Sequence, residues 1–458
     1  MKFAASSSKS PIELLPIETQ QAILSSLTDI ASLQQCALSC PTLYSSYKAA
    51  EKIIISQVLF KQIGIGVLPE AVMALSSSRL KFIELESFTS ANFQKRQPAP
   101  EVYTFKDALL ISNFHLIVEF LTRDFVHKAL AASPFMEPSG LVVPATPTEI
   151  DRIQRAFYMF EIYRNIFTRH YFNRQWRSEA QQGMFFQYFS AWQNEQLACV
   201  HDYLVQIVIP GFNEIAAHDV LWGSTNIKYA TGPNSQHIQA ILSQGLAHLH
   251  EIAMADSYAA RRKLMYKPYP PWCDLFLFPA MFFSQSVFYP YDLNPSERIV
   301  LKQDFYRGDD SGPEYAWRWG RFYDAVVILF DSTPRARQSR RWAYVMWDRR
   351  RLDRWGVFAQ RWSDTLVIPS REERELEREE GERMHAEMIS SWKRREVIHL
   401  AGGYGWWEAG DEGRVEWVKG KSSPWDDEAK RRDCDLCLGA VRCAPHRLVL
   451  KIKTDVDC

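Results

Sequence analysis

Apolar residues recur at helical spacing along most of this chain, and that period constrains the fold more than any other feature. The stretch TFKDALLISNFHLIVEFLTRDFVHKALAA (104–132) places apolar side chains three and four positions apart. The stretch 148–172 has the same period, and the strict alternation that indicates a half-buried strand is scarce. The pattern therefore predicts a mainly α fold. Further helices are expected over 69–85, 192–209, 234–255 and 370–397.

Shifts in composition divide the chain into four expected segments. Residues 1–10, rich in Ser, are expected to be a disordered lead, and 11–62 a compact helical unit. Residues 67–360 are expected to form a larger α-helical domain. Residues 361–458 read as a charged, irregular C-terminal region, in which a solvated helix precedes a cysteine-containing tail.

The overall composition argues against several classes of protein. The chain has 458 residues, 47% of them hydrophobic, and its formal net charge is zero, so no overall field attracts nucleic acid or an acidic membrane. No apolar run approaches the ~18 residues of a membrane span. Residues 1–13 lack the pattern of a secretory signal. We therefore expect a protein of the cytoplasm or nucleus, with reduced cysteines and neither nucleic-acid nor membrane partners.

The stretch ELLPIETQQAILSSL (13–27) is a compact apolar element close to the N-terminus. Its order of residues resembles the F-box, a three-helix motif of the substrate-recruiting subunits of cullin–RING ubiquitin ligases. The resemblance implies that a Leu-Pro pair and an apolar helix face dock onto the Skp adaptor, by the fit of helix anchors into a groove. It rests on these residues, which are the expected partner-binding residues: Leu15, Pro16, Ile23, Leu24, Leu27 and Leu33.

Three positions depart from the usual F-box pattern: Thr19, Ser32 and Leu43 stand where a Leu, an acidic residue and an aromatic residue are common. Blocks farther along the chain also look like those of F-box-containing families of filamentous fungi. These blocks are 152–167, 194–204, 216–223, 310–320 and 340–358. The resemblance implies a helical domain over 67–360 that recruits an unknown protein client, in a protein without catalytic residues.

Two alternatives remain open for the function. In the first, the helices of 11–62 are internal core of a non-catalytic interaction or structural protein with a degenerate F-box, because periodicity alone cannot distinguish a docking face from a core face. In the second, a remote one, the chain is a metal-dependent hydrolase, because imidazole and carboxylate groups together hold divalent metals. The order that imitates such a site is His170, His201, Asp202 and Asp219.

The tail CDLCLGAVRCAPH raises the possibility of a structural zinc ion. Its C-x2-C-x5-C-x2-H order is formed by Cys434, Cys437, Cys443 and His446. Two thiolates three positions apart can share one tetrahedral ion, although this spacing is not that of a known zinc knuckle. The alternative is a tail with free thiols.

The segment 335–354 is rich in arginine, with eight Arg against two Asp, and is interleaved with Trp342, Tyr344 and Trp347. Arginine with aromatic residues can bind phosphates and stack on bases. The interpretation that we favour is a helix with a basic outer face and an aromatic inner face, because the net charge is zero and no complete nucleic-acid motif accompanies the segment.

Overall fold

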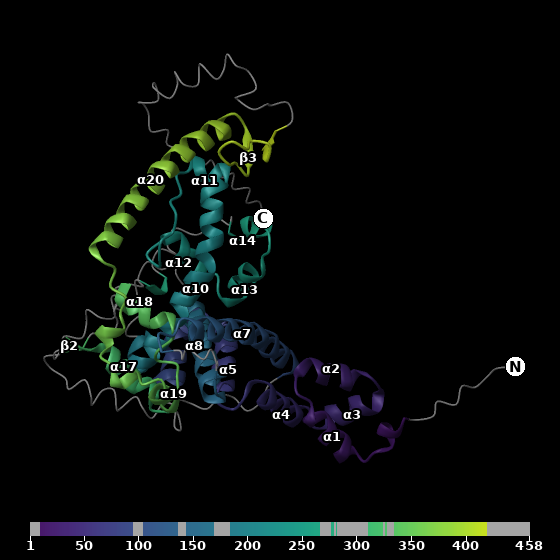
Figure 1. The fold of residues 1–458 in the computed structure, drawn as a ribbon. Coiled ribbons are helices and arrows are strands. Elements are labelled where there is room, and N and C mark those ends of the chain that lie inside the picture. Colours follow the sequence, from purple (N-terminus) through teal and green to yellow (C-terminus); the bar gives the residue numbers. More distant parts are fainter. Residues whose placement is uncertain are drawn as a thin grey trace. The chain divides into compact units, whose positions relative to one another are not determined.

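The structure is a computed structural model, and its mainly α fold confirms the prediction (Figure 1). The chain divides into two compact units. Unit 1 comprises Met1–Phe212 and Ala230–Ile368, and unit 2 comprises Asn213–Tyr229 and Pro369–Cys458. The residues that the structure describes are 10–94, 104–135, 143–168, 184–265, 276–278, 281, 310–323, 326–327 and 334–418.

The N-terminal helices of unit 1 share one small core and continue into the rest of that unit. They are η1 (Pro11–Leu14), α1 (Ile17–Ser26), α2 (Ile30–Leu38), α3 (Pro41–Ala49) and α4 (Glu51–Ile63). Both α2 and α4 pack on the long helix α7 (Phe105–Ala131), and the ring of Tyr47 meets that of Phe105 edge-on at 5.9 Å. Unit 1 therefore contains both the expected segment 11–62 and the start of the larger expected domain.

Helix α8 (Pro147–Thr168) forms the centre of unit 1 and is buried on nearly all sides, with α5 (Leu68–Ser77) and α7 packed against it. A helix in such a position must satisfy its polar side chains from other elements. Glu161 accepts a hydrogen bond from the backbone N–H of Leu246 at 2.9 Å, and Asn165 donates one to the carbonyl oxygen of Ala74 at 3.2 Å. These bonds attach α13 (Leu246–Met254) and α5 to α8.

The other elements of unit 1 are mostly short. The long helix α10 (Ala191–His218) starts in unit 1 and ends in unit 2. The strands β1 (Phe322–Tyr323) and β2 (Val326–Val327) form an antiparallel pair. The remaining elements are η2 (Phe82–Glu84), α6 (Leu85–Thr89), η3 (Ser90–Gln94), η4 (Phe186–Tyr188), α12 (Gln236–Leu242), α13 (Leu246–Met254), α14 (Tyr258–Met265), α17 (Gly312–Arg321), α18 (Pro334–Arg341), α19 (Arg349–Arg354), η8 (Val357–Ala359) and η9 (Trp362–Thr365).

Unit 2 combines the end of α10 with α11 (Val220–Ser224), α20 (Arg371–Leu400) and the antiparallel pair β3 (Gly403–Gly405) and β4 (Val415–Trp417). Its small core consists of Val220, Ile398, Trp407 and Val415, with Trp417 packed against them. The fully buried Arg395 donates hydrogen bonds at 2.8 Å to the carbonyl oxygens of Ala216 and Asp219. A buried cation thus satisfies carbonyl groups at the C-terminal end of α10.

Several predicted boundaries were wrong for local reasons. The cap of α8 is Thr146 with Glu149, whose backbone N–H donates to the Thr146 hydroxyl at 3.2 Å, so the helix begins at Pro147, before the start of the expected stretch at 148. The expected helix 234–255 is split by Gly245, which has a φ of 91°. Helix α10 continues through Pro210 to His218, beyond the expected end of that helix at 209.

Two further segments also differ from the sequence prediction. The glycine-rich stretch after α20 forms strand β3, although it lies in the region 361–458 that was expected to be irregular after its helix. In unit 1, α4 ends at Ile63, just before Gly64 and one residue beyond the expected end of the compact helical unit at 62. Among the described residues, no single helix has the length and apolarity needed to cross a membrane. Helices α4 and α5 meet that criterion only as a pair that bends by 108°.

Candidate functional site

The Leu-Pro turn before α1 is held in place by one buried polar side chain, Gln20. Its amide nitrogen donates hydrogen bonds to the carbonyl oxygens of Ile12 at 3.0 Å and Leu15 at 3.1 Å. Its amide oxygen accepts a hydrogen bond from the hydroxyl of Ser46 on α3. Gln20 is 2% exposed, so loss of these bonds would leave buried polar groups unsatisfied. The side chain therefore fixes the turn against both α1 and α3.

Glu13 adds a second connection to the same turn. Its carboxylate accepts a hydrogen bond from the backbone N–H of Ser10 at 2.7 Å and another from the Thr42 hydroxyl at 3.4 Å. The hydrogen bond from the Ser10 N–H, and after it those from the hydroxyls of Ser10 and Thr42, hold the pKa of Glu13 below its ordinary value. The charged form of Glu13 therefore fastens η1 to the start of α3.

The six expected partner-binding residues fall into two groups. Leu24 and Leu33 are fully buried in the core of the N-terminal helices, so they cannot touch a partner while these helices remain packed. Leu15 and Pro16 are exposed, and Ile23 and Leu27 are half-buried. The resemblance implied that all six belong to one docking face, and helical periodicity cannot separate the residues that support a surface from those that form it.

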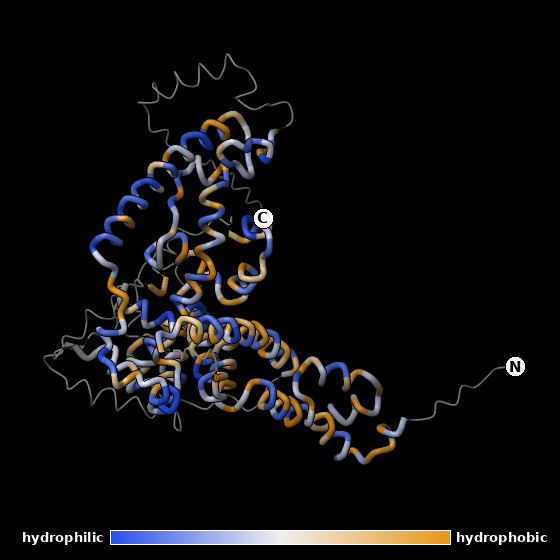
Figure 2. Tube along the Cα trace, in the orientation of Figure 1, coloured by the Kyte–Doolittle hydropathy of each residue, from blue (hydrophilic) through white to orange (hydrophobic). Residues whose placement is uncertain are grey.

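The structure adds exposed apolar residues that the resemblance did not single out. Leu14 is 70% exposed and Ile17 is 45% exposed, directly beside Leu15 and Pro16. We call these four consecutive residues, 14–17, the Leu-Pro surface, and Figure 2 shows the hydrophobic colour of the chain just before α1. Clustered apolar exposure of this kind marks interaction sites more often than scattered single residues do.

The three departures from the F-box pattern have structural explanations. Ser32 belongs to the cap of α2, where its backbone N–H and its hydroxyl donate to the carboxylate of Asp29 at 2.8 and 2.7 Å. Leu43 is buried and fills part of the N-terminal core with an aliphatic side chain. Thr19 is exposed on the first turn of α1, outside that core.

The His-Asp pairs do not form a metal site in the described residues. The ring of His201 is fully buried, with Nε2 2.9 Å from the Gln239 amide nitrogen and Nδ1 3.1 Å from Asp202. Because an amide nitrogen donates, Nε2 accepts and is not available to a metal. Asp219 caps α11 by accepting from the N–H of Trp222, and His170 lies outside the described residues. No cluster of His, Cys, Asp and Glu fit to hold a metal occurs within the described ranges.

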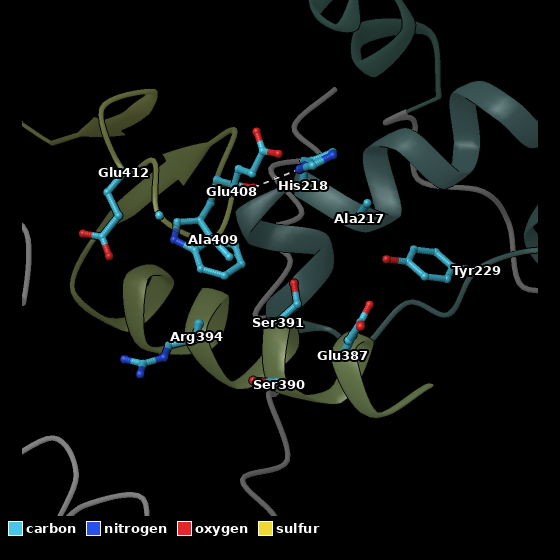
Figure 3. Close-up of a pocket in the computed structure, with 12 residues that line it drawn as sticks. Ala217, His218, Tyr229, Glu387, Ser390, Ser391, Arg394, Glu408, Ala409 and Glu412 are labelled. Carbon is cyan, nitrogen blue, oxygen red and sulfur yellow. Dashed lines mark hydrogen bonds between the residues drawn. The ribbon is translucent and has the colours of Figure 1, made fainter. Parts of the chain in front are cut away.

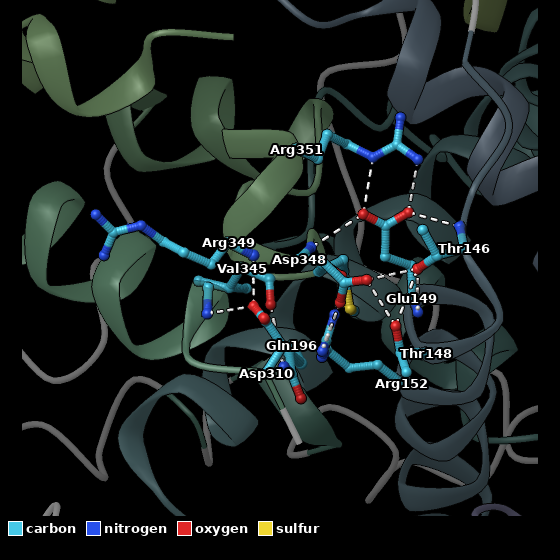
Figure 4. A network of polar contacts seen from close by, with 12 residues as sticks. Thr146, Thr148, Glu149, Arg152, Gln196, Asp310, Val345, Asp348, Arg349 and Arg351 are labelled. Atoms are coloured by element: carbon cyan, nitrogen blue, oxygen red, sulfur yellow. Dashed lines mark hydrogen bonds and ion pairs between the residues drawn. The ribbon is translucent and has the colours of Figure 1, made fainter. Parts of the chain in front are cut away.

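The Arg-rich segment is anchored in the core of unit 1. Arg351 is 6% exposed and forms a bidentate ion pair with Glu149 on α8, at 2.8 and 2.7 Å (Figure 4). Beside it, Asp348 accepts from Arg152 at 3.1 Å and from the hydroxyls of Thr146 and Thr148. Burial alone would raise the pKa of Asp348, but the two hydroxyls and the guanidinium hold it below its usual value.

A second buried ion pair anchors the start of the same segment. Arg340 donates to the two carboxylate oxygens of Glu195 on α10 at 2.8 and 3.0 Å and also contacts Asp202 at 3.4 Å. Burial would raise the pKa of Asp202, but the neighbouring guanidinium holds it below its ordinary value. The interleaved aromatic residues Trp342, Tyr344 and Trp347 are buried too. These side chains are therefore not available to stack on bases, and the segment consists of two short helices, not the single helix expected.

The zinc prediction lies outside the described residues, because Cys434, Cys437, Cys443 and His446 all fall within 419–458.

In comparisons with known proteins, no family model, no curated protein and no solved structure matches this chain. The candidate site that the sequence pattern and the geometry both support is the Leu-Pro surface, whose turn is held in place by Gln20 and Glu13.

Proposed function

We propose that this protein is a substrate-recruiting adaptor that docks through its Leu-Pro surface onto the Skp subunit of a cullin–RING ubiquitin ligase. The observation that carries the proposal is the exposure of four consecutive apolar residues on a turn that buried polar bonds hold in place. A turn fixed before binding loses less conformational entropy when a partner covers it. Ubiquitin transfer would be carried out by the ligase, and the rest of the chain would hold the client.

The division of the N-terminal residues favours docking on one side and packing on the other. Leu24 and Leu33 face inward at 0% exposure, whereas Leu14 and Ile17 remain open to solvent. Burial of a large aliphatic side chain stabilises a complex by about 1.5–3 kcal/mol before association costs are subtracted. Several such side chains are enough for specific binding if most of them engage.

The proposal is tested by co-purification of the full chain with the Skp adaptor. A variant with Leu15→Asp and Ile17→Asp removes two exposed anchors without touching the core, so it should fold and lose the adaptor. The matched control, Ile65→Asp with Ile83→Asp, places the same charges at two other exposed isoleucines, which are 80% and 87% exposed. The control should retain the adaptor.

Two outcomes would overturn the proposal. The first is a folded wild-type chain that does not retain the Skp adaptor. The second is equal retention by the wild type and the Leu15→Asp, Ile17→Asp variant. The first outcome would favour the alternative, a non-catalytic helical interaction protein whose F-box-like helices serve its own core, since α2 and α4 already pack on α7. The second outcome would mean that the adaptor binds through another surface of the chain. Circular dichroism of each variant establishes that it is folded.

A further inference from the structure

Two features of the molecule have no part in the proposed docking contact: a pocket in unit 2 and the exposed residue Ser10 in unit 1. The end of α10, Tyr229, α20 and the segment between β3 and β4 line the pocket (Figure 3). Its acidic side chains, Glu387, Glu408 and Glu412, point to separate sides in Figure 3, so these three carboxylates do not form one binding site.

Ser10 is followed directly by a proline and is open to solvent. Its backbone is extended, with a φ of −65° and a ψ of 154°. One class of protein kinases modifies a serine or threonine only when the next residue is proline, whose ring has a fixed φ and no backbone N–H. The pair Ser10-Pro11 therefore has the sequence and the exposure that such an enzyme requires.

Burial distinguishes Ser10 from the other Ser-Pro and Thr-Pro pairs that the structure describes. Ser133 also precedes a proline, but it is only 8% exposed. Thr146 is half-buried, and its hydroxyl caps α8 and donates to a carboxylate at 2.6 Å. The two remaining pairs of the sequence begin at Thr333 and Ser423, which lie outside the described residues. Among the described pairs, Ser10 alone is an exposed target.

The surroundings of Ser10 are built to hold one carboxylate, that of Glu13. The backbone N–H of Ser10 donates to it at 2.7 Å, and the Ser10 hydroxyl is a second donor. The Thr42 hydroxyl on α3 lies 3.4 Å from it, and the thiol of Cys40 is a further donor. These donors are all neutral, and within the described ranges no ion pair joins Glu13 to a cation. A second anion here would therefore meet Glu13 without a positive charge to offset it.

We propose that Ser10 is a phosphorylation site of a proline-directed protein kinase, and that phosphate at this residue releases η1 from α3. In the transfer, the Oγ atom of Ser10 forms a bond to the γ-phosphorus of ATP, the bond from that phosphorus to ADP breaks, and the hydroxyl proton leaves through the base of the kinase. The product has lost one donor to Glu13 and carries a charge of about −1.5 to −2 beside it. Repulsion between the two anions then moves the Glu13 carboxylate away from Thr42.

The attraction of a phosphate to the start of a helix does not offset this repulsion. η1 is a single turn of four residues, so few peptide dipoles are aligned in it. The N–H of Glu13 already donates to the carbonyl oxygen of Ser10 at 2.9 Å, and the N–H of Ser10 is bonded to the Glu13 carboxylate. Pro11 has no N–H to offer. η1 therefore provides few donors for the phosphate.

The consequence for docking rests on the proposed function, whereas the modification itself does not. η1 leads directly into the Leu-Pro surface, and Gln20 would still hold the carbonyl oxygens of Ile12 and Leu15, so the turn would loosen without unfolding. A looser turn loses more conformational entropy when a partner covers it. Phosphorylation of Ser10 should therefore weaken binding of the Skp adaptor by about tenfold.

The first test uses the full chain alone, treated with a proline-directed kinase and ATP. Mass spectrometry should locate a phosphoryl group on Ser10, and this group should be missing from Ser10→Ala and from Pro11→Ala, which keeps the hydroxyl. Hydrogen exchange of the amides of 12–14 should be faster in the phosphorylated chain. The proposal is overturned if Ser10 stays unmodified, if Pro11→Ala is modified as fully as the wild type, or if exchange does not change.

The second test measures binding of the purified Skp adaptor. The phosphorylated wild type should bind about tenfold more weakly than the unmodified chain, and kinase-treated Ser10→Ala, which controls for phosphate at other pairs, should bind within about twofold of it. Ser10→Glu should weaken binding, whereas the matched variant Ser363→Glu, at another exposed serine of unit 1, should not.

The outcomes of the second test separate this inference from the proposed function. Equal binding by the phosphorylated and unmodified chains would overturn the regulation of docking. An unmodified chain that never binds the adaptor would overturn the proposed function, and the free-chain measurements would then decide the role of Ser10. Circular dichroism should show that each variant keeps the helical content of the wild type.

Discussion

Helix α8 and the first part of α20, residues 371–387, both carry glutamates and arginines, but in opposite surroundings. In α8, Glu149 and Arg152 are buried, and their partners lie about 200 positions away along the chain, as for Glu149 and Arg351 at a separation of 202. In α20, every residue of 371–387 is exposed, and Arg378 pairs with Glu375 and Glu382 of the same helix. The same residue types thus hold distant elements together in one helix and support only local structure in the other.

The difference shows that the position of a charge, and not its presence, decides what it stabilises. A buried pair must offset the loss of hydration of both groups, so loss of one partner is severe. An exposed pair remains hydrated and is screened by salt, so its loss is mild. Four measurements can test or sharpen this contrast.

The largest effect is expected from Arg351→Met. The change leaves the carboxylate of Glu149 buried without its bidentate partner, and removal of one member of a buried ion pair costs about 3–5 kcal/mol. Urea unfolding should show this loss as a lower midpoint. The matched variant Arg349→Met breaks the more exposed pair with Asp353 on the same short helix and should cost about 1 kcal/mol or less. Equal losses in the two variants would contradict the contrast.

A pH effect is expected from His115 on α7, which contacts the hydroxyl of Tyr158 on α8 at 3.0 Å and lies 3.7 Å from Glu119. Burial lowers the pKa of His115 from 6.5 to about 4. Between these values the unfolded chain binds a proton that the folded chain does not. The free energy of unfolding should therefore fall by roughly 3 kcal/mol as the pH is lowered from 6.5 to 4. His115→Gln should flatten this slope, and an unchanged slope would show that His115 is not its source.

A gain in stability is expected from Gly381→Ala. Gly381 lies within the exposed part of α20, and a methyl group at this position would meet no other atom within 4 Å. Alanine favours an exposed helix interior by about 1 kcal/mol over glycine. Hydrogen exchange of the amides in 371–387 should become slower. Faster exchange would mean that the glycine has a role that the surroundings of α20 do not reveal.

The smallest effect is expected from Arg378→Gln. The change removes two ion pairs, both with exposed partners, and loss of such pairs is often not measurable. The thermal midpoint and the helical signal should stay at their wild-type values at physiological salt. A marked loss of helix would indicate that α20 has tertiary contacts in solution over this part of its length.

The sequence predicted the long helices well because the side-chain period and the capping residues that indicate a helix lie within or beside that helix. Helix α7 begins one residue after the start of its expected range, and α20 follows its charge pattern and the capping pair of Ser370 and Glu373. The burial of Arg340 and Arg351 could not be predicted in the same way, because Glu195 and Glu149 become their partners only when distant helices pack together.

Prediction of the candidate site from the sequence was limited in the same way. The resemblance identified the Leu-Pro pair, but it also implied that Leu24 and Leu33 belong to the docking surface, and both are core residues. Gln20, which holds the turn, was missed because a single Gln on α1 carries no sequence signal. Its role follows only from the carbonyl groups and the serine that the fold brings to it.

The most direct test of the account is hydrogen exchange of the full chain with and without purified Skp adaptor. If the Leu-Pro surface docks, the backbone amides of 12–20 should exchange more slowly when the adaptor is present at saturating concentration, while the amides of 82–94 should not change. Unchanged exchange across 12–20 in the presence of the adaptor would contradict the proposed function.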